Sequence, residues 1–68
     1  MADRTYKIIE LVGISEESFS DAVDDAIQRA DQTLEDLSWF EVIEERGSIS
    51  DGSVMEYQVK VKVAFELG

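Results

Sequence analysis

The sequence contains no cysteine, no histidine and no proline in its 68 residues, and each absence removes a class of structure or chemistry. Without cysteine there is no disulfide and no thiolate site for a metal or a redox reaction. Without histidine, the commonest metal ligand and the Ser-His nucleophile pair are missing. A chain this short rarely stabilises a lone core without disulfides, a metal or partner subunits. We therefore expect it to be stabilised by oligomerisation.

Basic residues are also scarce, because 6 Lys and Arg stand against 16 Asp and Glu, for a formal net charge of −10. Binding to nucleic acid is not expected, since affinity for phosphate backbones comes from clustered Lys and Arg. No uncharged run approaches the roughly 18 residues of a membrane span, and the first residues, MADRTYK, lack a signal peptide's apolar core. We expect a folded, cytoplasmic protein that binds neither nucleic acid nor membranes.

Two different periodicities mark the first half of the chain. Thr5–Val12 is rich in β-branched and aromatic residues and stops at Gly13, which predicts a strand. From Phe19 to Leu37, apolar residues recur at helical spacing, which predicts a helix of about five turns. Ser15 is the expected N-cap. The opposite helix face is acidic, and we interpret it as a solvated surface.

The second half of the chain has the pattern of a long β-hairpin. Two β-rich runs, Trp39–Ile49 and Val54–Leu67, flank the dipeptide Asp51-Gly52. A two-residue type I′ turn needs positive φ at both central positions, and Asp-Gly is one of the pairs that satisfies it. We therefore expect two long paired strands, with opposite positions summing to 103.

This register divides the hairpin into two faces. Apolar residues occupy every odd position from Met55 to Leu67, and Phe40 and Val42 share their face, which we expect to cover the helix. Charge pairs are expected between Glu41 and Lys62 and between Glu45 and Lys60. The polar face is predicted to carry Trp39, Glu41, Ile43, Glu45 and Ile49 beside Gln58, Lys60 and Lys62.

The segment order predicts an α+β fold, β-α-β-β, in a single domain over residues 1–68. If the first strand lies beside the last, the three-stranded antiparallel sheet has the order 1-3-2 and wraps one helix on one face. The other face is then uncovered, and it includes Trp39. Leaving this indole in water costs about 2–3 kcal/mol, so we expect another subunit or a flat ligand to cover it.

No catalytic set is present in the sequence. Adjacent carboxylates such as Asp24-Asp25 and Glu44-Glu45 arise by chance among 16 acidic residues, and we interpret them as solvated charge. The chain has no phosphate-binding loop, dinucleotide motif or calcium loop. We expect no catalytic residue, no metal site and no enzymatic activity.

Trp39 and Gln58 are the remaining candidates for ligand binding. An indole stacks on planar heterocycles, and an amide can pair with the donors and acceptors of a pyrimidine-like ring. Composition alone favours a plainer interpretation, in which Trp39 packs at a subunit contact and Gln58 is an ordinary exposed residue. The predicted register separates the two residues by about 20 Å along the sheet, so a shared site would lie between subunits.

Seven segments, spread over nearly the whole chain, have the length, spacing and order of one family. They are YKIIELVG (6–13), SEES (15–18), AIQRA (26–30), WFEV (39–42), Arg46-Gly47, EYQV (56–59) and VAFEL (63–67). The sequence resembles the dodecins. The resemblance implies a hollow homododecamer with 23 symmetry that binds flavins, or products such as lumichrome, stacked between tryptophans at subunit interfaces. It implies a role in flavin storage, buffering and photoprotection.

The resemblance also assigns roles to single residues. It makes Trp39 the stacking residue and Gln58 the partner of the flavin's polar edge. Glu66 stands where many bacterial dodecins have an arginine that meets the phosphate of flavin mononucleotide (FMN). A carboxylate there repels phosphate, which favours riboflavin, lumichrome or lumiflavin. Arg46, a weaker candidate that matches the family's Arg-Gly pair, would partly compensate and keeps FMN in consideration.

Two further expectations stay open at this point. Coenzyme A is compatible as a second ligand, because the resemblance extends to dodecins that bind it. The alternative function is an acidic oligomeric interaction or shell module, which keeps the fold but has little affinity for flavin.

Overall fold

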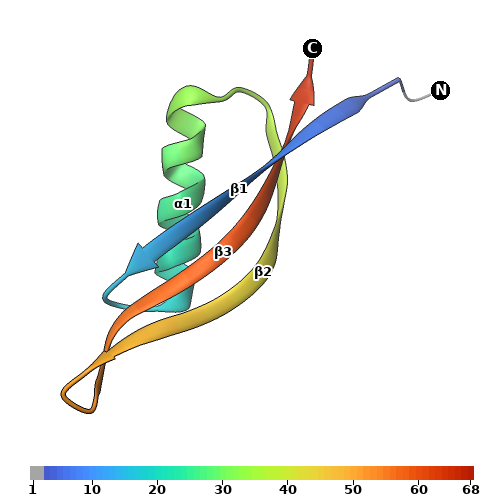
Figure 1. Ribbon diagram of the computed structural model, residues 1–68. Coiled ribbons are helices and arrows are strands. Elements are labelled where there is room, and N and C mark those ends of the chain that lie inside the picture. The colour runs from blue at the N-terminus through green and yellow to red at the C-terminus, as the bar shows by residue number, and fades with distance from the viewer. Residues whose placement is uncertain (1–2) are drawn as a thin grey trace.

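Three strands and one helix make up the computed structural model, which describes residues 3–68 (Figure 1). Their order is β1 (Thr5–Ser15), α1 (Phe19–Thr33), β2 (Leu37–Ser50) and β3 (Ser53–Leu67). The strands form an antiparallel sheet of order β1-β3-β2. This confirms the predicted α+β fold and strand order. Of the expected domain over residues 1–68, residues 1–2 lie outside the described part.

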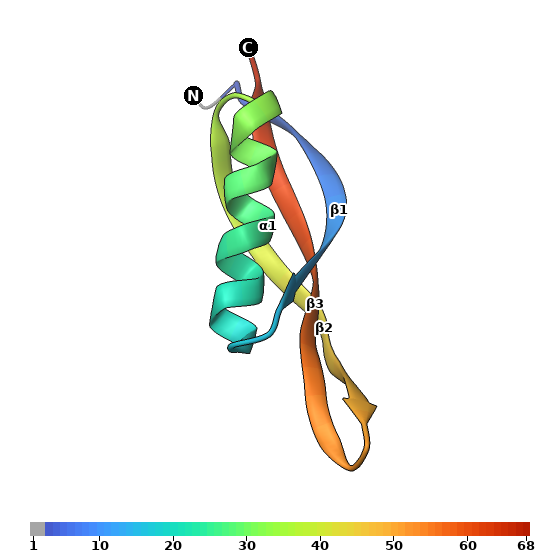
Figure 2. The same cartoon turned by 90° about the vertical axis from the view of Figure 1, so that its left-hand side faces the viewer.

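The sheet is strongly curved, and α1 lies along its concave face, as Figure 2 shows. Val59, Val61 and Val63 of β3 are fully buried beneath the helix. The helix contributes small residues, Ala22 and Ala26, to this core. It packs mainly against β1 and β3, so Phe40 and Val42, on the same face of β2, remain about half exposed.

The helix begins at Phe19 rather than directly after Ser15, and it ends at Thr33 rather than at Leu37. Its N-cap is Ser18, whose hydroxyl accepts a hydrogen bond from the Asp21 backbone at 3.0 Å. The predicted N-cap, Ser15, is wrong, because Ser15 is still paired with Tyr57 as the last residue of β1. Helical spacing continues to Leu37, but the helix ends at Thr33, so the five-turn prediction is also wrong. Leu37 already belongs to β2.

Gly13 does not end the first strand, as the sequence predicts, but lies within it. It pairs with Val59, and β1 continues for two further residues. A Cβ atom at Gly13 would overlap the backbone carbonyl oxygen of Ala22 in α1. The glycine is therefore required by the close approach of the helix to the strand, and not by a turn.

The β2–β3 hairpin has the predicted turn. Asp51 and Gly52 have φ values of 51° and 78°, as a type I′ turn requires. The predicted register holds from Trp39, opposite Ala64, to Val42, opposite Val61. The sequence-based register is therefore confirmed over this part of the hairpin.

Beyond Val42, a β-bulge overturns the predicted faces. The register shifts between Val42 and Glu44, so Glu44 and not Glu45 lies opposite Lys60. An extra residue reverses which face the following side chains occupy, so the predicted outward placement of Glu45 is wrong: Glu45 lies opposite the buried Val59. A second shift, between Ser48 and Ile49, restores the original register. The bulge brings Arg46 directly opposite Gln58.

The predicted charge pairs across this hairpin do not form. Glu41 and Lys62 are opposite each other in the register. Among residues 3–68, however, the ion pairs within 4.0 Å are Arg29–Asp25 on the helix and Arg46–Glu44 on β2.

The helix of the described part, α1, has 15 residues and an acidic face. It is neither long nor apolar enough to cross a membrane.

Candidate functional site

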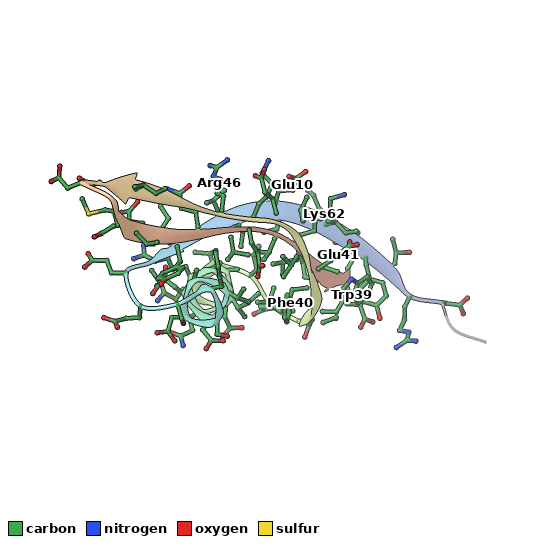
Figure 3. The ribbon with its side chains drawn as sticks, turned by 90° about the horizontal axis from the view of Figure 1, so that it is seen from below. Glu10, Trp39, Phe40, Glu41, Arg46 and Lys62 are labelled. Carbon is green, nitrogen blue, oxygen red and sulfur yellow. The ribbon has the colours of Figure 1, made fainter. Side chains whose placement is uncertain are left out.

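The sheet face opposite α1, called here the outer face, carries every residue that the sequence proposes for ligand binding. Residues paired with even positions of β3 share this face, because the odd valines point into the core. Figure 3 shows Glu10, Arg46 and Lys62 on the side away from the helix, and Phe40 on the helix side. The outer face includes Tyr6, Ile8, Glu10, Val12 and Ile14 of β1, Trp39, Glu41, Glu44 and Arg46 of β2, and Glu56, Gln58, Lys60, Lys62, Ala64 and Glu66 of β3.

Trp39 lies at one end of this face, in contact with Tyr6 of β1. The two ring centroids are 4.6 Å apart, and the planes are tilted by 56°. Ala64, the β3 residue opposite Trp39, is fully buried. Trp39 itself is 49% exposed, so its indole still presents a broad surface to a partner. Tyr6 was missed by the sequence reasoning, since finding it requires the register of β1 on β3 as well as that of the hairpin.

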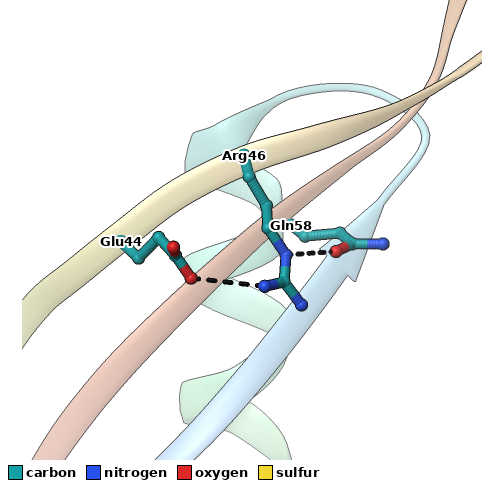
Figure 4. Close-up of polar contacts among 3 residues, drawn as sticks. All are labelled: Glu44, Arg46 and Gln58. Atoms are coloured by element: carbon teal, nitrogen blue, oxygen red, sulfur yellow. Dashed lines mark hydrogen bonds and ion pairs between the residues drawn. The ribbon is translucent and has the colours of Figure 1, made fainter.

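Gln58 lies in the middle of a polar network formed after the bulge (Figure 4). Arg46 Nε donates to Gln58 Oε1 at 2.7 Å, and Arg46 Nη1 donates to Glu44 Oε1 at 3.3 Å. Gln58 Nε2 donates to Glu56 Oε1 at 3.4 Å. The amide orientation is thereby fixed from both ends. One carbonyl lone pair and one N–H remain for a ligand.

The candidate residues fall into two groups. Trp39, Tyr6 and Glu66 form the indole end, because Glu66 pairs with Tyr6 and is the next outward residue of β3 after Ala64. Arg46, Gln58 and Glu44 form the amide end. Ala64 and Gln58 are six positions apart on β3, or about 20 Å. The structure therefore does not bring Trp39 and Gln58 together within one chain.

Arg46 and Glu66 also belong to different ends. Arg46 is opposite Gln58, and Glu66 lies eight positions further along β3, about 27 Å away. Within one chain, Arg46 is too far from Glu66 to offset its charge.

Two open apolar hollows lie along the sheet, and each is lined in part by a residue of α1. One borders Trp39 and is lined by Ile27, Leu37, Ser38, Trp39, Phe40 and Val63. The other lies near the hairpin and is lined by Phe19, Gly47, Ser48, Ile49, Val54 and Tyr57. Neither hollow includes Gln58. Among residues 3–68, no group of three or more Asp and Glu side chains is placed to hold a metal ion.

Comparisons with known proteins all match this chain to the same kind of protein over nearly its full length. Residues 5–68 match the family model described as Dodecin. A dodecin from Thermus thermophilus is 50% identical over 64 residues, which cover 94% of this chain and 93% of the relative. The solved dodecin from Streptomyces coelicolor has a TM-score of 0.95 at 46% identity, covering 100% of this chain and 97% of that one. A calcium dodecin from Mycobacterium tuberculosis is 31% identical over 62 residues, covering 91% of this chain and 87% of its own.

Proposed function

This chain belongs to the dodecin family, and from that premise we propose that it is a flavin-binding protein for storage, buffering and photoprotection. In the proposed assembly, twelve copies form a hollow particle with 23 symmetry in the cytoplasm. Flavins lie at subunit interfaces, stacked between Trp39 side chains. The protein binds its ligand without catalysing a reaction.

The observation that carries the proposal is the exposed indole on the outer face. Trp39 points away from the only core that the described residues form, and it is 49% exposed. On the same face, Ile8, Val12 and Ile14 are 46 to 53% exposed. Apolar surface of this extent is costly in water, and a neighbouring subunit together with a stacked aromatic ligand would remove it.

The separation of the two ends supports a site built from more than one subunit. About 20 Å lies between Trp39 and Gln58 within a chain. A stacked flavin is far shorter than this separation. We infer that the indole of one copy and the amide end of another copy meet the same ligand, with Gln58 facing the polar edge of the isoalloxazine ring.

The position of Glu66 supports a ligand without phosphate. Its carboxylate lies at the indole end, next to the strand position of Trp39, and is partly buried. A ligand stacked on the indole with its side chain toward the end of β3 would bring a phosphate close to this charge. Riboflavin, lumichrome and lumiflavin are therefore preferred over FMN.

Titration of riboflavin with the assembled protein tests this function. Flavin fluorescence should be strongly quenched on binding, because the stacked indole can donate an electron to the excited flavin. Trp39→Ala should weaken binding at least tenfold and reduce the quenching of what still binds. Phe40→Ala is the matched control, since Phe40 is the next residue, equally exposed at 50%, and on the opposite face of the strand.

The outcomes separate this function from two others. An assembled wild-type protein that neither binds nor quenches riboflavin would favour the acidic interaction or shell module. Steady reduction and reoxidation of the bound flavin, well above the rate of free flavin, would instead indicate an enzyme.

A further inference from the structure

Tyr6 and Trp39 form an aromatic pair across the sheet, although neither is next to the other in sequence or on an adjacent strand. Tyr6 is in β1 and Trp39 in β2, and β3 runs between them. Strands separated by one intervening strand lie about 10 Å apart. A ring centroid distance of 4.6 Å therefore means that both side chains lean over β3 toward each other.

Ala64 is what makes this contact geometrically possible. It is the outward residue of β3 opposite Trp39, and it is completely buried although it belongs to the outer face. The outward residues on either side of it, Lys62 and Glu66, have long side chains. The single methyl group of Ala64 leaves the space in which the two rings meet and close over the strand.

The contact restricts an indole that is otherwise free to move. A half-exposed tryptophan on an edge strand has several accessible rotamers, and binding a ligand to one of them costs the entropy of the others. With Tyr6 against the indole at a tilt of 56°, part of that ordering is complete before a ligand arrives. The exposed remainder of the indole is then already oriented.

We propose that Tyr6 is a positioning residue for the flavin, which holds the Trp39 indole at the angle needed for stacking, with Ala64 providing the space for this contact. The inference rests on the proposed function, because it concerns the same stacking site. We assign the role to the tyrosine ring and not to its hydroxyl, since the contact is between the two rings, with centroids 4.6 Å apart.

Three variants distinguish the contribution of the Tyr6 ring from that of its hydroxyl and from a general effect of changing β1. Tyr6→Val removes the ring and keeps a residue favoured in strands, and Tyr6→Phe removes the hydroxyl only. Lys7→Val is the matched control, because the neighbouring residue is exposed and points to the opposite face of β1. Each variant is first tested for assembly by size-exclusion chromatography.

The first measurement needs no flavin. Trp39 is the only tryptophan in the chain, so indole fluorescence anisotropy and near-ultraviolet circular dichroism report on this side chain alone. We expect Tyr6→Val to lower the anisotropy and weaken the dichroism, and Tyr6→Phe and Lys7→Val to leave both unchanged. The riboflavin dissociation constant should rise about fivefold in Tyr6→Val and stay within about twofold in the other two.

Should Tyr6→Val fail to assemble, Ala64→Val gives the same comparison. Its two added methyl groups lie beneath the rings and would break their contact, while both aromatic residues remain in the chain. Wild-type anisotropy and affinity in the assembled ring-deleted variant would overturn the inference and leave the proposed function standing. A wild-type protein that binds no riboflavin would contradict the proposed function itself, whatever the variants do.

Discussion

Arg46 holds the amide of Gln58 in one orientation, with its Nε donating to Gln58 Oε1 at 2.7 Å across the β2–β3 ladder. Glu44 holds the guanidinium in turn, through a contact of 3.3 Å. The three side chains meet only because the bulge after Val42 turns Arg46 and Glu44 to the outer face. In the proposed site, Arg46 would act on the flavin's polar edge through Gln58, at the end of the sheet away from Glu66.

Arg46→Ala tests this arrangement. We expect riboflavin to bind about fivefold more weakly, because the amide freed from Arg46 has to be ordered when the ligand binds. Fluorescence titration in the assembled state measures the effect.

The matched control is Arg29→Ala, which removes an arginine that is also exposed and also paired with a carboxylate, Asp25, at 3.3 Å on α1. Both variants change the net charge equally. Equal loss of affinity in the two would show that the charge, and not the contact with Gln58, is what matters at Arg46.

Glu66→Arg should change which flavin the protein prefers. In the wild type, repulsion of about 1 kcal/mol at this partly exposed carboxylate should make riboflavin bind about fivefold more tightly than FMN. The substitution reverses the local charge, so it should improve FMN affinity more than riboflavin affinity, with a gain that shrinks as salt is added.

Glu17→Arg makes the same change of charge at an exposed position before the helix. It should leave the ratio of riboflavin affinity to FMN affinity unchanged. If riboflavin and FMN respond equally to Glu66→Arg, the phosphate does not lie near this residue and the predicted selectivity is wrong.

Gly13→Ala should destabilise the subunit. The added methyl group would collide with the carbonyl oxygen of Ala22, which belongs to the helix backbone and cannot rotate away. We expect the free energy of unfolding to fall by at least about 2 kcal/mol, measured by denaturant unfolding at fixed protein concentration.

Gly68→Ala is the control, since a methyl group there would meet nothing within 4 Å. A Gly13→Ala protein as stable as the control would mean that the helix can move away from β1 at little cost.

The sequence by itself determined the elements and most of their pairing. Asp51-Gly52 specified the turn through its need for positive φ, and strict alternation from Met55 to Leu67 specified which face of β3 meets the helix. With the strand pattern of Thr5–Val12 and the helical spacing from Phe19, they predicted the β-α-β-β order. The sheet order 1-3-2 was predicted on the condition that the first strand lies beside the last. These features are local, because each depends on the backbone preferences and periodicity of neighbouring residues.

The tertiary structure alone decided how the candidate site is arranged. Nothing in the residues around Ile43 signals the bulge that places Arg46 opposite Gln58, because a bulge depends on how two long strands twist together. The contact of Tyr6 with Trp39 requires the registers of all three strands at once. From the sequence, Gly13 is predicted to end a strand, and only the position of the α1 backbone shows why a glycine is needed there. Each of these features is a contact between segments distant in sequence, which local periodicity does not encode.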